Sequence, residues 1–378
     1  MKKQLKQDGI TLIALVITII VLIILAGVTI NMLVGENGII TQAQKAKEDT
    51  EKAKIEEEQA INHLYDTIMT EGKVNVIDKT VEQMKEEGSY MGGNTQIKDS
   101  KGNKVIIPGG FKIATDSSVN IVDGIVIEDK KQNQFVWVPS NKSILKEDNT
   151  LAKDENQFVE SVSQYKGFYV ARYEAGLENA ILENKENSNN DEYWTAWKET
   201  ELVSKKDKIV WNYITAKKAN ELANNMYKEN SYVKSRLVSS NAWDTIIEFI
   251  SDAVNVDGNI IDSTSYGNYR DATFTIDSIN AQYSLDGTNY LKINKGDSKA
   301  KQQNYLLTTG ATEYTKTKNI YDLAGNVREL TSKMEEQNYF IRAGHYTLYG
   351  ANSPINYSAT VDSKVASDSL SFRVVLYL

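Results

Sequence analysis

The longest hydrophobic run lies near the N-terminus, where residues 10–30 carry no charge. A helix of about 21 residues spans the ~30 Å hydrocarbon core at ~1.5 Å per residue. A secretory signal has a shorter apolar region of ~7–15 residues and ends in a small-residue cleavage site, which is missing here. The pattern therefore predicts a transmembrane helix over residues 10–34. Lys2, Lys3 and Lys6 precede it, which predicts a cytoplasmic N-terminus.

Residues 39–72 change to a charged, weakly amphipathic pattern. Small apolar residues recur at spacings of three, four and seven: Ala43, Ala46, Ala53, Ala60 and Leu64. This spacing is typical of one face of a helix. We expect a stalk helix over 39–72 that is either solvated or packed on a neighbouring subunit.

Beyond residue 73, short apolar strands alternate with turns and a few amphipathic segments. Residues 73–131 form a strand-rich lead-in, in which 80–87 read as a short helix. Residues 130–133 are expected to turn a hairpin. TAKKANELANNMYKEN and SSNAWDTIIEFISDA are predicted helices, the second with Trp243, Ile246, Ile247 and Ile250 facing inward. This order predicts an α+β fold rather than a parallel α/β fold.

The amino-acid composition argues against several classes of function. The net charge is −8, and no cluster of basic residues could replace the counterions of nucleic acid, so a nucleic-acid partner is not expected. The chain has no cysteine, which excludes disulfides and thiolate chemistry, and it has only two histidines. No nucleotide-binding or hydrolase motif is present.

The N-terminus resembles the class III signal of type IV pilins and pseudopilins. Gly9 matches the last leader residue and Ile10 the first mature, methylated one, followed by Thr-Leu-Ile. The resemblance implies a cleaved leader over 1–9, a prepilin peptidase and other pilin-like subunits as partners. Ala14 replaces the pilin glutamate, which favours an anchor or tip role over a filament shaft.

A second resemblance covers residues 132–378 and the strands before them. QFVWVP, GFYVARYEAG, SRLVSSNAWDTIIEFI, NIYDLAGNVRELT, RAGHY and SFRVVLYL follow in one order. Together they resemble the formylglycine-generating-enzyme (sulfatase-modifying factor) family, a variant of the C-type-lectin-like fold. The resemblance implies such a domain at the end of the predicted transmembrane and stalk helices.

The same resemblance argues against catalysis. The family's oxidase needs two cysteines that bind copper and handle the substrate thiol. Because this chain has none, soft thiolate ligation of copper is impossible, and formylglycine formation is excluded. No copper or other redox cofactor is expected.

The segment 322–329 is the candidate metal site. By the family pattern, structural Ca²⁺ would be bound by the side chains of Asp322 and Glu329 and the carbonyls of Gly325 and Val327. Hard oxygen ligands of this kind suit Ca²⁺. The alternative is a capped glycine turn without metal.

Two further charged residues are interpreted as structural residues of the fold. Arg373 lies in an apolar terminal strand and Glu174 lies near a strand end. Both are expected to be buried and to serve the framework.

The late loop, residues 346–358, together with His345 just before it, is the candidate ligand-binding surface. Tyrosine among Asn, Ser and Gly is the composition of adaptable recognition surfaces. The alternative is an ordinary surface loop of a Tyr-rich and Asn-rich protein. The candidate contact residues are His345, Tyr346, Tyr349, Asn352, Asn356 and Tyr357.

These patterns predict a bacterial, single-pass membrane protein that presents a non-catalytic lectin-fold domain outside the cell. The bilayer is its expected partner, and its ligand is a glycan or a protein. Two alternatives stay open at this point. One is a cysteine-independent enzyme of the same fold, and the other is a structural minor pilin.

Overall fold

The computed structural model describes residues 15–26, 40, 42–47, 49–54, 57, 74–140, 144–185, 195–254 and 261–378. The chain divides into two units, Met1–Glu71 and Gly72–Leu378. In the first unit, residues 15–26, 42–47 and 49–54 are helical. Gly9, Ile10 and Ala14 lie outside the described residues.

The expected long N-terminal transmembrane and stalk helix is wrong. Within the described ranges, no helix is both long enough and apolar enough to cross a membrane. The described part of this apolar run, residues 15–26, is helical and spans about 18 Å at ~1.5 Å per residue, against the ~30 Å of the hydrocarbon core. The structure thus supports neither the single-pass membrane localisation nor the membrane and pilus assignments.

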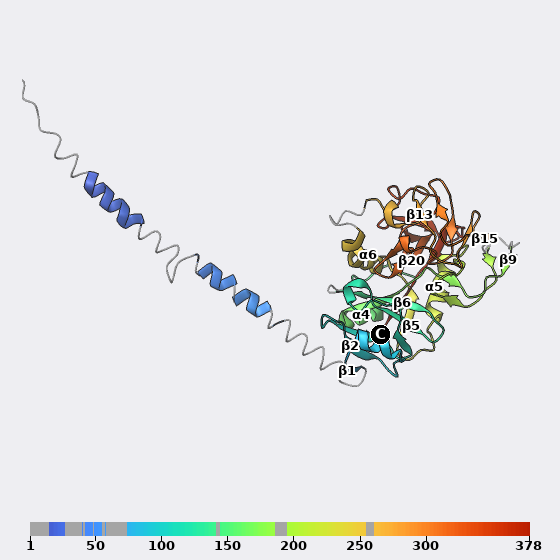
Figure 1. Ribbon diagram of the computed structural model, residues 1–378, viewed down its shortest axis with the longest axis horizontal. Coiled ribbons are helices and arrows are strands. Elements are labelled where there is room, and N and C mark those ends of the chain that lie inside the picture. The colour runs from blue at the N-terminus through green and yellow to red at the C-terminus, as the bar shows by residue number, and fades with distance from the viewer. Residues whose placement is uncertain are drawn as a thin grey trace, which may run out of the picture. The chain divides into compact units, whose positions relative to one another are not determined.

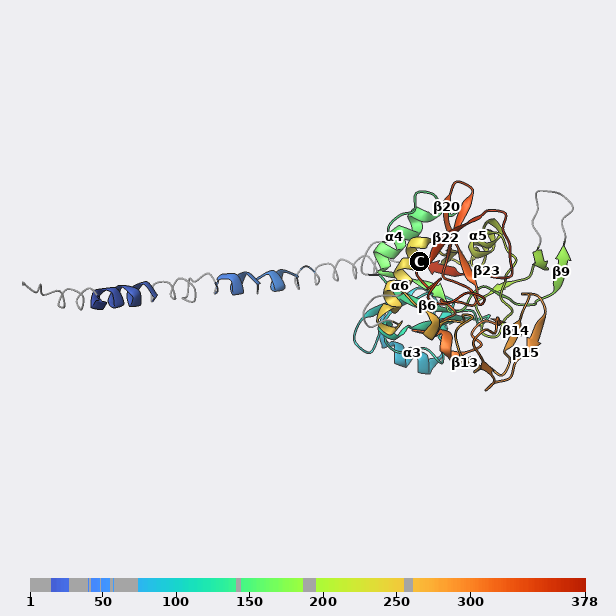
Figure 2. The ribbon, with the colours of Figure 1, turned by 90° about the horizontal axis from the view of Figure 1, so that it is seen from above.

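The unit Gly72–Leu378 is built on a six-stranded antiparallel sheet (Figures 1 and 2). Its order is β12 (Lys234–Leu237), β24 (Val374–Tyr377), β7 (Gly167–Ala171), β6 (Gln134–Pro139), β5 (Val126–Asp129) and β4 (Phe111–Ile113). β5 and β6 form the hairpin expected around residues 130–133, with Ile127 opposite Phe135.

A four-stranded sheet carries the motif segments near the C-terminus. Its order is β22 (Ser358–Asp362), β21 (Asn338–Arg342), β20 (Arg328–Glu335) and β23 (Leu370–Phe372), and only the β20–β23 pair is parallel. The late loop connects β21 to β22.

Among the described residues, two three-stranded sheets and four strand pairs complete the unit. One sheet holds β1 (Asn75–Thr80), β2 (Thr95–Lys98) and β3 (Lys104–Ile107), and the other holds β15 (Tyr290–Lys292), β14 (Gln282–Ser284) and β17 (Leu306–Leu307). The pairs are β9 (Leu182–Lys185) with β10 (Thr195–Trp197), β8 (Gly176–Leu177) with β11 (Leu202–Val203), β13 (Phe274–Thr275) with β16 (Ser298–Lys299), and β18 (Lys316–Thr317) with β19 (Ile320–Tyr321).

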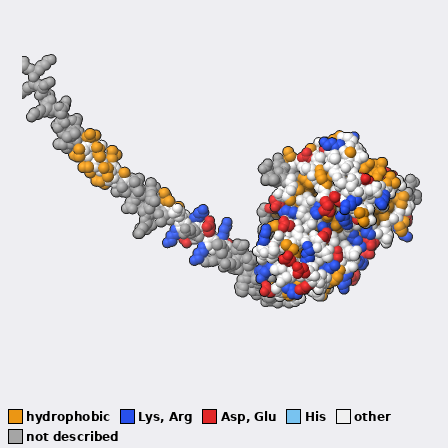
Figure 3. All heavy atoms as spheres, in the orientation of Figure 1, with side chains coloured by type: hydrophobic (Ala, Val, Ile, Leu, Met, Phe, Trp, Pro, Cys, Tyr) orange, Lys and Arg blue, Asp and Glu red, His pale blue; other side chains and the backbone are white. Residues whose placement is uncertain are grey.

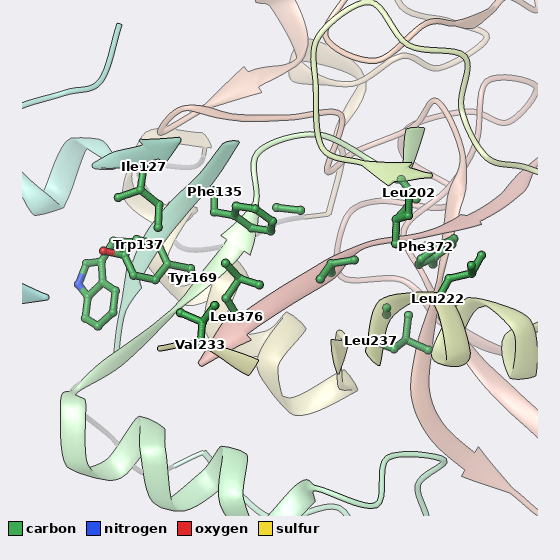
Figure 4. Close-up of a cluster of buried hydrophobic side chains, with 14 of the residues drawn as sticks. Ile127, Phe135, Trp137, Tyr169, Leu202, Leu222, Val233, Leu237, Phe372 and Leu376 are labelled. Atoms are coloured by element: carbon green, nitrogen blue, oxygen red, sulfur yellow. The ribbon is translucent and has the colours of Figure 1, made fainter. Parts of the chain in front are cut away.

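Four helices cover the two faces of the six-stranded sheet. α3 (Val81–Glu87) and α5 (Ala216–Asn225) pack on one face, and α4 (Glu155–Tyr165) and α6 (Ser240–Val254) pack on the other. Successive strand residues point to opposite faces, so both faces of a central strand must be apolar. In QFVWVP, Phe135 and Trp137 accordingly enter the first core, and Val136 and Val138 the second. Figure 4 shows part of the first core, with Leu222 of α5 beside sheet residues.

The local signals of the helices hold in part, since Ile247 of the expected inward face of α6 is only partly buried. Thr80 caps α3 through a reciprocal pair of hydrogen bonds with Gln83, as a capping box requires. In α6, Trp243, Ile246 and Ile250 are buried as expected. The capping hydroxyl of α6 belongs to Ser239, whose Oγ accepts from Ala242 N at 3.1 Å.

Candidate functional site

A buried ion pair lies where the motif segments meet. Arg373, between β23 and β24, donates from Nε and Nη2 to Glu329 of β20 at 2.6–3.0 Å. Nη1 donates to Ala171 O at 2.9 Å and Nη2 to Tyr321 O at 3.0 Å. Both charged side chains are fully buried. Burial raises the pKa of Glu329, although Arg373 acts to lower it. The expectation of a buried, paired Arg373 is confirmed.

Glu174 and Asn326 form a second buried contact beside this pair. Asn326 Nδ2 donates to Glu174 Oε2 at 2.6 Å, and Val327 N donates to Oε1 at 3.3 Å. Asn326 also accepts from Asn268 Nδ2 at 2.9 Å, and its main-chain carbonyl accepts from Tyr346 N at 3.1 Å. Burial, reinforced by nearby carboxylates, raises the pKa of Glu174 well above its usual range. Glu174 is therefore a framework residue, as expected.

The predicted calcium ligands have other partners. Asp322 accepts from Gly310 N at 2.8 Å and from Thr315 Oγ1 at 2.6 Å, and Glu329 is bound to Arg373. Nowhere in the described chain do three or more His, Asp or Glu side chains form a group that could hold a metal ion. Both carboxylates are thus engaged within the protein, and Ca²⁺ binding there stays a prediction.

Gly325 and Val327 hold the turn of this segment closed. Gly325 has φ of +77°, and a Cβ there would lie 2.4 Å from Asn268 O. Val327 is buried in a small apolar cluster with Tyr346. The segment thus has the geometry of a tight glycine turn packed against residue 268.

The late loop places its candidate residues at different depths. Tyr349 is exposed by 39%, and Asn352 and Asn356 are exposed. His345 and Tyr357 are half-buried, whereas Tyr346 is buried and donates its hydroxyl to Asp368. Tyr346 is therefore a packing residue in this structure, and the other five border the surface.

His345 lies between surface and core. Its Nδ1 is 3.2 Å from Thr347 Oγ1. Burial, aided by the positive charge of Arg328, lowers the pKa of His345 to about 4, against the opposing effect of Asp368. The imidazole is thus neutral near pH 7, and it is a hydrogen-bonding group rather than a charge.

Two arginines that the sequence analysis did not single out border the late loop. The Arg328 guanidinium lies 5.6 Å from the ring centre of Tyr357, and that of Arg270 lies 5.7 Å from Tyr349. Arg270 N donates to Leu348 O at 2.8 Å, which holds the two segments together. The sequence signal was the position of Arg328 inside the NVRE motif, directly after the turn.

Two clefts lie elsewhere on this unit. They enclose about 500 and 590 Å³, and Tyr227 and Lys228 line both. Neither of these two clefts includes a late-loop residue. Lys, Arg, Asp and Glu side chains are intermixed on the face shown in Figure 3.

Comparison with known proteins leaves the family open. No family model and no curated protein matches the chain, so the pilin-type signal gains no support there. Similar solved structures include PvdO from Pseudomonas aeruginosa, with TM-score 0.36 and 14% identity over 67% of this chain and 98% of that one. Treponema denticola variable protein 1 is similar with TM-score 0.33 and 11% identity over 65% of this chain and 96% of that one. CarF is similar with TM-score 0.34 and 13% identity over 64% of this chain and 98% of that one. At these TM-scores no function follows from the similarity.

Proposed function

We propose that the unit Gly72–Leu378 is a non-catalytic ligand-binding domain of the formylglycine-generating-enzyme-like, C-type-lectin-like type. The sequence motifs support this proposal because four of them meet in one buried network. RYEAG contributes Glu174, NIYDLAGNVRELT contributes Asn326 and Glu329, and SFRVVLYL contributes Arg373. RAGHY joins through Tyr346 N.

The same network supports binding without catalysis. Glu174, Asp322 and Glu329 are fully or almost fully buried and bonded within the protein, so none can reach a substrate as acid, base or nucleophile. The chain also lacks cysteine, which removes the oxidase chemistry of the family. The motif residues act as a framework that holds the late loop.

The observation that carries the proposal is the polar and aromatic late-loop surface next to this framework. Tyr349, Asn352 and Asn356 are exposed, and Tyr357 is half-buried. A tyrosine supplies a large contact area with few rotatable bonds, and amides supply both donors and acceptors. The ligand that fits such a surface is a glycan or a protein.

A glycan array with the full chain tests the proposal. We expect binding to a restricted set of glycans, lost in Tyr349→Ala and retained in Tyr90→Ala. Tyr90 is a matched control because it is exposed by 38%, against 39% for Tyr349. Binding that survives changes at Tyr349 and Tyr357, or no glycan or protein ligand at all, would contradict the proposal.

A further inference from the structure

The arginines of the chain divide into two groups. Four form ion pairs with carboxylates: Arg172 with Asp116, Arg236 with Glu155, Arg342 with Asp244, and Arg373 with Glu329. The remaining two, Arg270 and Arg328, have no carboxylate within ion-pair distance among the described residues. Both are the arginines beside late-loop tyrosines. Both arginines without a carboxylate partner therefore lie against the late loop.

Arg328 is the more unusual of the two. It is half-buried, and its Nε atom is buried without a hydrogen-bond partner in the described structure. Burial lowers the pKa of Arg328, and no acid stands among the groups that oppose this shift. The buried Nε cannot itself contact a ligand, but no hydrogen bond within the described structure engages Nη1 or Nη2, and neither is among the buried unpartnered atoms, so these two nitrogens are the donors available to one.

Arg270 is held at the same loop by backbone contacts. Its Nε donates to Gln302 Oε1 at 2.5 Å, which leaves the other guanidinium nitrogens available. Asn268 and Asn326 are joined by a side-chain hydrogen bond of 2.9 Å, and each arginine lies two residues beyond one of them. The framework thus carries both arginines to the late loop.

The carboxylates that contact this loop are already engaged. Asp271 accepts from Gly350 N at 3.2 Å and from Thr264 Oγ1 at 3.2 Å, and Asp368 accepts from the Tyr346 hydroxyl. Neither pairs with an arginine. The two guanidinium groups therefore keep donors for a ligand anion, although Asp271 and Asp368 retain their charge and the whole chain is acidic.

We infer that this surface binds an acidic saccharide, with Arg328 receiving the carboxylate or sulfate group. This inference rests on the proposed function and names its ligand class. A guanidinium offers a planar fork that matches a carboxylate or sulfate bidentately. The rings of Tyr349 and Tyr357 flank the two arginines, and the Asn352 and Asn356 amides suit ring hydroxyls. Neutral His345 contributes a hydrogen bond without a competing charge.

Calorimetric titration of the full chain with matched ligands tests this inference. We use oligogalacturonate, its neutral methyl ester, a sulfated galactan oligosaccharide and oligoglutamate. We expect both acidic saccharides to bind and the methyl ester to bind far more weakly. Of the two, the tighter ligand shows whether carboxylate or sulfate is preferred.

Variants locate the contact. Arg328→Gln should weaken binding about 10- to 100-fold, as loss of hydrogen bonds to a charged group does. Arg328→Lys should recover part of it because charge without the fork remains. Lys217→Gln, an exposed residue of α5, is the control for net charge. The melting temperature of Arg328→Gln should fall only slightly, because the protein contact that is lost is the one with the Tyr357 ring.

Several results would overturn the inference. These are equal binding of the methyl ester, unchanged affinity in Arg328→Gln, equal or tighter binding of oligoglutamate, or no binding of any acidic saccharide. If neutral glycans bind through Tyr349 while Arg328→Gln has no effect, the proposed function stands and only the ligand class is wrong.

Discussion

The buried pair Glu329–Arg373 gives the sharpest stability prediction. Glu329→Gln preserves shape but removes the charge that balances Arg373, which is left with the carbonyls of Ala171 and Tyr321. Both side chains are fully buried, so solvent cannot replace the lost carboxylate. Removing one partner of a buried ion pair costs about 3–5 kcal/mol. For a unit of this size we expect a melting temperature lower by about 5–8 °C.

The loss of unfolding free energy in Glu329→Gln is measured by urea unfolding, with the same dependence on urea concentration in both proteins, and by a double-mutant cycle. Glu329→Met with Arg373→Met removes both charges at similar volume, so it should be less destabilising than the sum of the single changes. An interaction energy of at least about 1 kcal/mol is expected between neighbours in contact. A loss below about 1 kcal/mol for Glu329→Gln, or strict additivity in the cycle, would refute the reasoning.

Three further predictions concern single residues. Burial lowers the pKa of Lys299 to about 8, so its contribution to stability should rise between about pH 8 and 10.5, by at most about 3 kcal/mol. Urea unfolding at pH 7.5 and at pH 10 should show this rise in the wild-type protein but not in Lys299→Met. An identical pH dependence of stability in the wild type and the variant would contradict the prediction. His345, with its pKa lowered to about 4, should stay neutral at about pH 5.5 in histidine NMR spectra, where only two signals occur. The contribution of neutral His345 to stability should be fully present above about pH 6.5 and be lost as the pH falls through about 4. The His345→Asn variant identifies the NMR signal of His345, and titration of that signal near pH 6.5 would disprove the lowered pKa. Gly325→Ala should destabilise by about 3 kcal/mol or more because its Cβ would meet Asn268 O at 2.4 Å, whereas Gly296→Ala, also at positive φ but in open space, should cost less. Equal losses at the two glycines would remove the steric argument.

The sequence alone determined much of the local structure. α6 follows from the spacing of Trp243, Ile246 and Ile250, because a helix repeats its buried face every three to four residues. The β5–β6 hairpin follows from two apolar runs around a polar turn. An arginine in an apolar strand requires a partner, so the buried, paired state of Arg373 was also predictable.

The N-terminal prediction shows where a one-dimensional pattern misled. The uncharged run over 10–30 indicated a membrane-spanning helix by length and polarity alone, but the apolar helix that the structure describes covers only residues 15–26. Hydropathy measures how apolar a run is, whereas crossing a membrane also requires a continuous helix of about 20 residues, which polarity by itself does not guarantee.

Only the tertiary structure decided which side chains remain for a ligand. Glu329 was read as a metal ligand because nothing local shows that Arg373, which is 44 residues away, takes both its oxygens. Tyr346 and Tyr349 lie in the same loop and have the same composition signal, yet one is buried and the other exposed. Arg328 drew no attention in the sequence because an arginine is ordinarily satisfied. Its lack of a partner is a property of the surrounding fold, since charge balance is set by groups that only long-range packing brings together.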